Sequence, residues 1–248
     1  MKVALITGAS YGVGAATALA LARDGFHVVV TATRVRNLDA TLAAVREAGQ
    51  KAIGTELDLR SQLSIEKTAA AAIEALGQID VLVNNAGVNL RSKAVETARD
   101  DFEDVLSTNV TGTFFLTQQI GRYLVARRAA GRIITIASAH ALVGAPERSA
   151  YGISKAALLQ MTRMLAIEWA EYGITVNAVA PGRLDTASPS RAGTGSNKDY
   201  VEAMLKRIPL HRLATAEEVA AATVFLAGPG AASITGQTIV IDGGLTAA

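Results

Sequence analysis

The stretch Val3-Ala4-Leu5-Ile6-Thr7-Gly8-Ala9-Ser10-Tyr11-Gly12-Val13-Gly14 decides the fold of this chain. A short apolar run leads into a glycine-rich turn, and the alanine-rich residues 15–22 that follow have the composition of a helix. Such a turn lets the backbone approach a pyrophosphate, while the helix N-terminus adds unpaired N–H groups and a favourable dipole. The spacing is GxxxGxG instead of the usual GxGxxG. In this position it favours nucleotide binding over a merely tight connection.

Short apolar, β-branched runs recur along the 248 residues, and segments of helical length rich in alanine and leucine separate them. These runs suit strands that are covered on both faces, as in a parallel sheet. The alternation implies right-handed crossovers and a doubly wound sheet. We therefore predict an α/β fold, a single domain over residues 1–248, with about seven parallel strands and helices on both faces. The predicted strands are 3–6, 28–30, 52–57, 81–83, 133–136, 174–179 and 238–241, and helical patterns cover 38–49, 65–77 and 100–128.

Composition excludes several classes of protein. Half of the residues are hydrophobic and the net charge is only +2, so we expect a substantial core and no nucleic-acid partner. There is no cysteine, and the three histidines lack zinc-binding spacing, so we predict no metal site. No apolar segment approaches about 20 uninterrupted residues, and no membrane span is expected. We expect a soluble, cytoplasmic protein.

The pentapeptide Tyr151-Gly152-Ile153-Ser154-Lys155 is the candidate for chemistry. Helix positions four apart share a face, which would set a phenol beside an ammonium group. A lysine about 4 Å away offers roughly 4 kcal/mol, or about three units of tyrosine pKa, although desolvation of the phenolate opposes this. The phenol would then be a usable general acid or base. Taken alone, the pentapeptide is equally compatible with an ordinary helix face.

Several motifs occur together in a fixed order. They are TGASYGVG at 7–14, NNAG at 84–87, Asn109, Ser138 thirteen residues before Tyr151, YxxxK at 151–155, Pro181-Gly182 with Thr186, and DGG at 242–244. In these motifs the chain resembles the short-chain dehydrogenase/reductase family from end to end. Their co-occurrence in this order is specific, although no single motif is decisive.

The resemblance implies a catalytic set of Asn109, Ser138, Tyr151 and Lys155. Tyr151 would exchange a proton with the substrate oxygen, Ser138 would polarise the carbonyl, Lys155 would lower the tyrosine pKa and bind the nicotinamide ribose, and Asn109 would hold a relay water. The cofactor would contact Gly8, Ser10, Tyr11, Gly12, Val13, Gly14, Thr33, Arg34, Asp58, Leu59, Asn85, Ala86, Gly87, Tyr151, Lys155, Pro181, Gly182 and Thr186. Asp58 could instead cap the next helix, Asn84 could satisfy turn backbone, and His140 could line the pocket or be incidental.

The end of the second predicted strand bears on cofactor choice. An acidic residue some 20 residues beyond the glycine loop would bind the ribose 2′-hydroxyl of NAD, but this position holds Ala32, followed by Thr33 and Arg34. No carboxylate there would repel a 2′-phosphate, so NADP(H) is favoured and NAD(H) stays possible. Tyr11 argues mildly the other way, because many NADP-preferring relatives carry a basic residue there.

The predicted activity is hydride transfer between NADP(H) and a small ketone or secondary alcohol. The pattern looks most like the 3-oxoacyl-[acyl-carrier-protein] reductases, and sugar or polyol dehydrogenases share nearly all of these features. A non-catalytic nucleotide-binding regulator is the competing class, although such proteins typically break the Tyr/Lys pair or lose the serine. Residues 186–208 are expected to form a substrate lid. The resemblance also implies a homotetramer.

Overall fold

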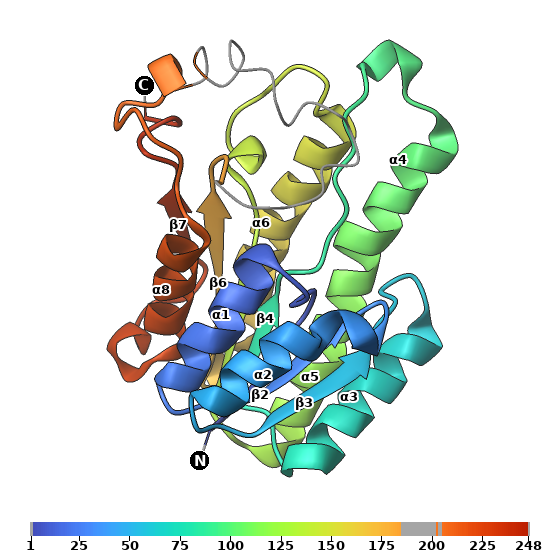
Figure 1. Ribbon diagram of the computed structural model, residues 1–248. Coiled ribbons are helices and arrows are strands. Elements are labelled where there is room, and N and C mark those ends of the chain that lie inside the picture. Colours follow the sequence, from blue (N-terminus) through green and yellow to red (C-terminus); the bar gives the residue numbers. More distant parts are fainter. Residues whose placement is uncertain (1, 185–201, 203–204, 248) are drawn as a thin grey trace.

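Seven parallel strands form one sheet at the centre of the protein (Figure 1). The computed structural model describes residues 2–184, 202 and 205–247. The strands lie in the order β3-β2-β1-β4-β5-β6-β7, so the direction of winding reverses between β1 and β4. The predicted doubly wound α/β fold is thus confirmed. The strands are β1 (Val3–Ile6), β2 (His27–Ala32), β3 (Ala52–Glu56), β4 (Val81–Asn84), β5 (Gly131–Ile136), β6 (Ile174–Pro181) and β7 (Thr238–Ile241).

The central strands are apolar because both of their faces are covered. Every residue of β1, β4 and β6 is buried, which β-branched side chains on a pleated surface suit well. The register pairs Val3 with His27 on one side of β1 and Ala4 with Val81 on the other. All seven predicted strands are present, and no strand end differs from its prediction by more than two residues.

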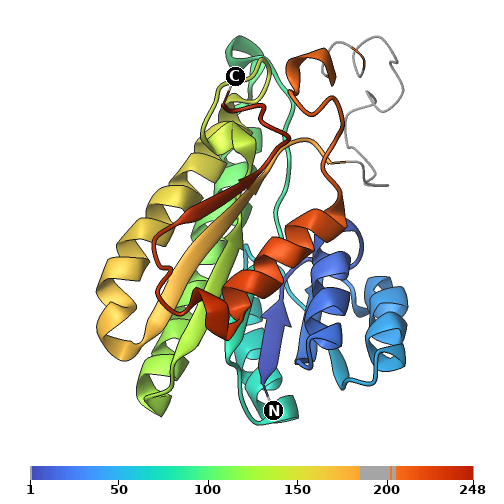
Figure 2. The same ribbon diagram turned by 90° about the vertical axis from the view of Figure 1, so that its left-hand side faces the viewer.

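The helices divide between the two faces of the sheet. One apolar cluster joins the sheet to α1, α2 and α8, and a second joins it to α3, α5 and α6. Figure 2 shows β7 at the edge of the sheet, with α6 on one side and α8 on the other. The helices are α1 (Gly12–Arg23), α2 (Asp39–Glu47), α3 (Gln62–Leu76), α4 (Arg99–Leu106), α5 (Thr113–Arg127), α6 (Ser149–Trp169) and α8 (Ala216–Ala227).

Helix α3 begins and ends at recognisable capping residues. The Ser61 hydroxyl accepts a hydrogen bond from Ser64 N at 3.3 Å, and Gly77 closes the helix in the left-handed conformation, with φ of 77°. The predicted stop at Gly77 is confirmed. The alternative in which Asp58 caps this helix is wrong, because the N-cap is Ser61, three residues further on.

The segment predicted as one helix over 100–128 contains a wider turn. Between α4 and α5 lies η3 (Ser107–Gly112), a π-helical turn that includes the buried Asn109. Single π turns occur frequently at functional sites, and helix propensity does not predict them. The short 3₁₀ elements are η1 (Val35–Leu38), η2 (Ala94–Glu96), η4 (Ala139–Ala141), η5 (Ala170–Tyr172) and η6 (Pro229–Ala231).

Two predicted features fall largely beyond what the structure describes. Thr186 and most of the 186–208 segment lie outside the described residues; within it, residues 202 and 205–207 are helical. Among the helices that the structure does describe, none combines the length and the apolar composition needed to cross a membrane.

Candidate active site

The parallel strands end at one edge of the sheet, and the predicted site residues gather there. The glycine loop follows β1, Thr33 and Arg34 follow β2, Asp58 follows β3, and the NNAG segment runs from the end of β4. Ser138 comes shortly after β5, and Pro181 ends β6. Open α/β sheets bind ligands at this edge, beside the point where the strand order reverses. Here that point lies between β1 and β4.

The glycine loop is shaped for close approach of a ligand to the backbone. Gly8 has φ of +65°, and a Cβ there would lie 2.8 Å from Ala86 Cα. A Cβ on Gly14 would lie 2.4 Å from Gly8 O and 2.5 Å from Asn85 Nδ2. Helix α1 starts without a side-chain cap and without an acidic residue in its first turn. Its free N–H groups and positive dipole end fit a pyrophosphate.

A buried threonine joins the glycine loop to the NNAG segment. Thr7 Oγ1 accepts hydrogen bonds from Asn85 N at 3.0 Å and Ala86 N at 2.9 Å. In return, Asn85 Nδ2 donates to the carbonyls of Thr7 and Gly8, both at 2.9 Å. Asn84 serves the interior instead, because its amide donates to Thr117 Oγ1 on α5 at 2.7 Å and so does not cap turn backbone. Four hydrogen bonds thus hold the glycine loop against the NNAG segment.

The loop after β2 carries Thr33 and Arg34, which were predicted to influence cofactor choice. Thr33 and Arg34 are exposed, while Ala32 is buried and pairs with Glu56 at the end of β3. The Glu56 carboxylate accepts a long hydrogen bond from Val35 N at 3.4 Å. Sequence reasoning missed Glu56, because a carboxylate contributed by the neighbouring strand is visible only once the strand pairing is known.

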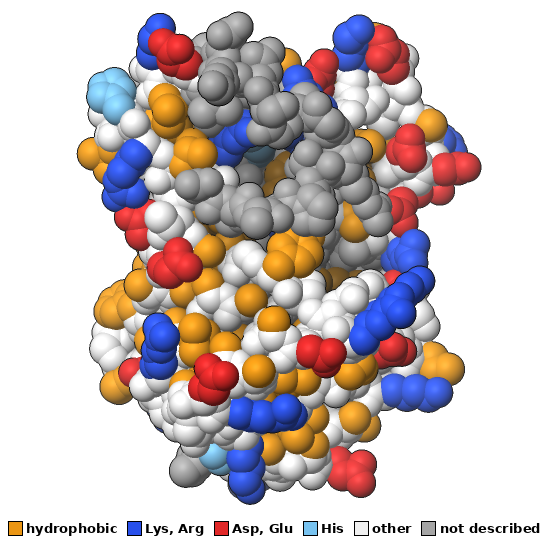
Figure 3. Space-filling model, in the orientation of Figure 1, with side chains coloured by type: hydrophobic (Ala, Val, Ile, Leu, Met, Phe, Trp, Pro, Cys, Tyr) orange, Lys and Arg blue, Asp and Glu red, His pale blue; other side chains and the backbone are white. Residues whose placement is uncertain are grey.

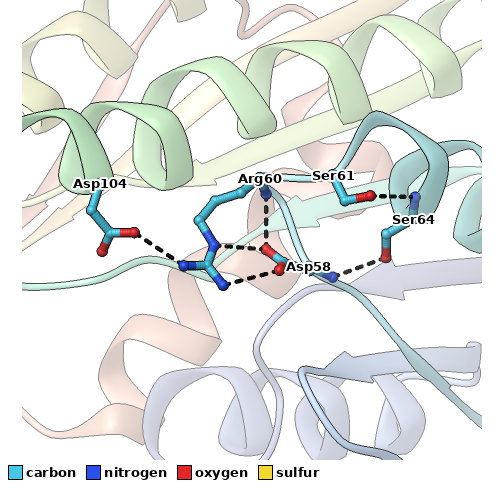
Figure 4. Close-up of polar contacts among 5 residues, drawn as sticks. All are labelled: Asp58, Arg60, Ser61, Ser64 and Asp104. Atoms are coloured by element: carbon cyan, nitrogen blue, oxygen red, sulfur yellow. Dashed lines mark hydrogen bonds and ion pairs between the residues drawn. The ribbon is translucent and has the colours of Figure 1, made fainter. Parts of the chain in front are cut away.

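Asp58 sits in a small ionic cluster (Figure 4). Its carboxylate accepts from Arg60 Nε and Nη2, each at 3.0 Å, and Arg60 Nη1 also reaches Asp104 on α4 at 3.2 Å. The hydrogen bond from Arg60 holds the pKa of Asp58 below its ordinary value. The Asp58 N–H donates to Ser64 Oγ at 3.0 Å. The carboxylate is therefore ionised and fixed, as a ligand-binding residue requires, and the adjacent Leu59 is buried.

Ser138 and Tyr151, two of the predicted catalytic residues, lie side by side. The Ser138 side chain is hydrogen-bonded to Tyr151, and Ser138 Oγ also accepts from His140 N at 3.2 Å. Burial raises the pKa of Tyr151 above its ordinary value, whereas the Ser138 hydrogen bond and the charge of Arg148 lower it. The expected net lowering of the tyrosine pKa is therefore wrong for this structure, because desolvation of the phenolate outweighs the favourable contributions.

Lys155 lies beneath the tyrosine ring, as the spacing of four predicted. Its Nζ is 5.8 Å from the centre of the Tyr151 ring and donates to Ile136 O at 2.8 Å. Burial lowers the pKa of Lys155 to about 8. A group that titrates there can give or take a proton near neutral pH.

Asn109 connects the strand-end loop after β4 to the start of α6. Its Oδ1 accepts from Val88 N at 2.8 Å, and its Nδ2 donates to Val88 O at 2.9 Å and to Ser154 Oγ at 3.0 Å. Ser154 in turn donates to Tyr151 O at 2.7 Å. A Cβ on Gly87 would lie 3.0 Å from Asn109 Oδ1 and 3.7 Å from Lys155 Nζ, so both side chains border the same glycine. Asn109 is fully buried, so it is not an ordinary solvent-exposed helix residue.

His140 stands against Tyr151. Its half-buried ring meets the Tyr151 ring edge to face, with centres 6.3 Å apart, and its buried Nδ1 has no hydrogen-bond partner. Burial and the nearby charge of Arg148 lower the pKa of His140, so the imidazole is neutral at pH 7. The guanidinium of Arg148 is anchored by Asn89 Oδ1 at 2.6 Å. Neither Asn89 nor Arg148 was predicted, since neither belongs to a recurring motif.

The end of β6 closes the remaining side of the edge. Gly182 N donates to Ile241 O at 2.9 Å, which places the Pro181-Gly182 turn beside β7. The Asp242 carboxylate accepts from the N–H groups of Gly244 and Thr246 and so holds the C-terminal turn. Figure 3 shows hydrophobic side chains exposed across the middle of this face, with Lys, Arg, Asp and Glu side chains around them. Within the described part of the chain, no cluster of His, Asp or Glu could hold a metal ion.

This fold and site define a nicotinamide-dependent dehydrogenase or reductase. A family model described as enoyl-(acyl carrier protein) reductase matches residues 8–246. The chain belongs to the short-chain dehydrogenase/reductase family, as the resemblance predicted. It is therefore an oxidoreductase that interconverts a carbonyl and an alcohol with NAD(P).

Proteins named for different substrates match this chain over nearly its whole length. The 3-oxoacyl-[acyl-carrier-protein] reductase of Synechocystis is 38% identical over 98% of this chain and 96% of the relative. The gluconate 5-dehydrogenase of Gluconobacter oxydans is 33% identical over 98% and 94%, respectively. The crystal structure of actinorhodin polyketide ketoreductase with NADPH superposes with a TM-score of 0.92 at 37% identity, covering 99% of this chain and 97% of the ketoreductase.

Proposed function

We propose that this protein is an NADP(H)-dependent oxidoreductase that interconverts ketones and secondary alcohols, with Tyr151 as the proton-transfer group. One observation carries the proposal: the Tyr151 side chain is hydrogen-bonded to Ser138, while Lys155 lies under its ring. Asn109, in the π turn η3, borders Gly87 together with Lys155. A proton donor, a carbonyl-polarising hydroxyl and a buried ammonium group thus converge at the ligand-binding edge.

The side chains divide the reduction between them. A bound nicotinamide supplies the hydride. Tyr151, kept protonated by burial, donates its proton to the substrate oxygen as negative charge develops there. Ser138 Oγ already accepts from His140 N, so its own hydroxyl proton is directed to the phenol or the substrate oxygen. These donors stabilise the oxyanion, and Lys155, with its pKa of about 8, can restore the proton to Tyr151.

The cofactor-binding residues fit a dinucleotide. The cradle of Gly8 and Gly14 and the uncapped start of α1 suit the pyrophosphate, and the fixed carboxylate of Asp58 suits an adenine edge. NADP(H) is proposed over NAD(H) because Thr33 and Arg34 are exposed beyond β2 while Ala32 provides no carboxylate. The NADPH bound to the ketoreductase relative supports this choice.

For the substrate, the proposal is a 3-oxoacyl compound, and a sugar or polyol is the second candidate. The Synechocystis relative favours the first and the Gluconobacter relative favours the second at similar identity. Residues 186–208 would supply the lid. A homotetramer and a cytoplasmic location complete the proposal; the half-exposed Ile153 and Met164 of α6 are compatible with a subunit contact on that helix.

The proposed function is tested with a panel of acetoacetyl thioesters, keto-sugars, oxo acids and small diketones, each with NADPH and with NADH. We expect turnover of at least one class, with the higher kcat/KM on NADPH. Equal or better kcat/KM with NADH would overturn the cofactor proposal. Binding of NADPH without reduction of any ketone would favour a nucleotide-binding regulator.

The Tyr151→Phe variant separates chemistry from binding. Loss of the phenolic proton should lower kcat by about 10² to 10⁴-fold, since general acid catalysis contributes that much. The dissociation constant for NADPH, measured by fluorescence, should stay within about threefold of the wild type, because the cradle is untouched. Retained turnover in this variant would remove Tyr151 from the mechanism.

A further inference from the structure

Beside Tyr151 lies a polar cluster that the proposed mechanism does not use. It consists of Asn89 after β4, His140 in η4, and Arg148 immediately before α6. Gly152 N donates to Arg148 O at 2.7 Å, which fixes Arg148 one turn before the reactive tyrosine. Arg148 Nη1 donates to Asn89 Oδ1 at 2.6 Å, so the guanidinium spans from the start of α6 to the opposite strand-end loop.

Arg148 gives this cluster a positive charge. A Cβ on Gly152 would lie 3.2 Å from His140 O, so the first turn of α6, which Arg148 precedes, packs against η4. The charge of Arg148 also acts to lower the pKa of both Tyr151 and His140. The adjacent carboxylate of Glu147 is paired with Arg91 on the same loop as Asn89.

The second observation is the buried Nδ1 of His140, which has no hydrogen-bond partner. A buried polar atom left unpaired is costly, and in native proteins it usually has a ligand or water partner. The ring meets Tyr151 edge to face, with ring centres 6.3 Å apart, so the imidazole lies beside the phenol that would react with a substrate. A guanidinium and a neutral imidazole side by side are suited to bind a carboxylate.

We propose that Arg148, with His140 beside it, is the specificity-determining subsite of this enzyme and that it binds the carboxylate of a short oxo acid or hydroxy acid. The inference rests on the proposed function and narrows it: among 3-oxo compounds and sugar derivatives, it selects those with a free carboxylate near the reacting carbon. Arg148 binds the substrate and takes no part in bond making. Asn89 positions the guanidinium.

The test compares an oxo acid with its neutral isostere, acetoacetate with acetoacetamide and levulinate with levulinamide. For the wild type, we expect kcat/KM to be at least about tenfold higher for the acid of one pair. Arg148→Met should bring this ratio to about one or below, whereas Arg148→Lys should retain part of the preference. Any effect of Arg148 on the pKa of Tyr151 applies to both members of a pair and cancels in the ratio.

Controls address charge and folding. Arg99→Gln removes an equal charge from α4, where Arg99 pairs with the exposed Glu103, and should leave the ratio unchanged. His140→Phe keeps a ring against Tyr151 and should lower the ratio by a few-fold. Malonate should inhibit reduction of a neutral ketone competitively, with an inhibition constant at least about tenfold higher in Arg148→Met. Should that variant fail to fold, the wild-type ratio and Arg148→Lys still decide.

The outcomes distinguish the two proposals. Equal turnover of acid and amide by the wild type, or a ratio unchanged in Arg148→Met, overturns the carboxylate subsite and leaves the ketone reductase proposal standing. Failure to reduce any acid, amide or other ketone overturns the proposed function itself.

Discussion

The proposed cofactor cradle and the proposed proton-transfer side lie at the same edge of the sheet, but different kinds of group build them. In the cradle, backbone groups and small side chains satisfy one another, as where Thr7 accepts two N–H groups and Asn85 returns two bonds to carbonyls. On the other side, Tyr151, Lys155 and His140 are titratable groups whose pKa values burial has shifted.

The difference shows that the two sites depend on different physical requirements. The cradle requires shape, because a dinucleotide binds through backbone N–H groups and a close approach. The proton-transfer side requires groups held out of water, and keeping a charge there costs stability. Gly14→Ala should therefore weaken cofactor binding without changing the titratable groups. A pH series should measure what the burial of Lys155 costs in stability, and Glu56→Gln should show how far the 2′-phosphate lies from β3.

The largest effect on cofactor binding is expected from Gly14→Ala, which breaks the cradle alone. The new Cβ would lie 2.4 Å from Gly8 O and 2.5 Å from Asn85 Nδ2, so the loop must move. Overpacking against backbone costs about 1–3 kcal/mol, and we expect affinity for NADPH to fall by about a hundredfold. Calorimetric titration measures the dissociation constant. Gly144→Ala is the matched control, since no atom lies within 4 Å of its Cβ position. Unchanged affinity in Gly14→Ala would show that the ligand does not use this loop.

An intermediate effect is expected from pH, through Lys155. Its pKa is about 8 in the folded protein against an ordinary 10.5, so between those values the unfolded chain binds more protons. Stability therefore rises with pH across that window, by up to about 3 kcal/mol, and the penalty is fully present below pH 8.

Lys155→Met isolates this contribution. Urea unfolding of both proteins from pH 7 to 10.5 should show the wild type gaining stability relative to the variant as pH rises. At pH 7 the variant avoids the cost of the buried charge, but it also loses the hydrogen bond to Ile136 O, which reduces its advantage by about 1 kcal/mol. Parallel curves for the two proteins would mean that Lys155 keeps its ordinary pKa when folded.

The smallest effect is expected from Glu56→Gln, which tests whether the 2′-phosphate binds near the end of β3. Glu56 is exposed and pairs with Ala32, close to Thr33 and Arg34, so its charge opposes an anionic group there only weakly. Removing it should raise the ratio of kcat/KM for NADPH over NADH by about two- to fivefold. Glu47→Gln, at the end of α2, is the control and should leave the ratio unchanged. A shift toward NADH would place the 2′-phosphate elsewhere.

The sequence by itself determined the strands, the doubly wound class, the glycine loop and the face shared by Tyr151 and Lys155. These follow from local patterns: apolar runs of strand length, a glycine turn between strand and helix, and a spacing of four on a helix. Such patterns depend on neighbours in the chain, so they can be read without knowing what lies across the fold.

Only the tertiary structure decided the rest. The upward shift of the Tyr151 pKa and the lowered pKa of Lys155 depend on how far packing removes each group from water. The π turn at Asn109 and the position of Arg148 near His140 depend on contacts between loops many residues apart in the chain. Desolvation and long-range contacts are properties of the assembled core, and no local pattern encodes them.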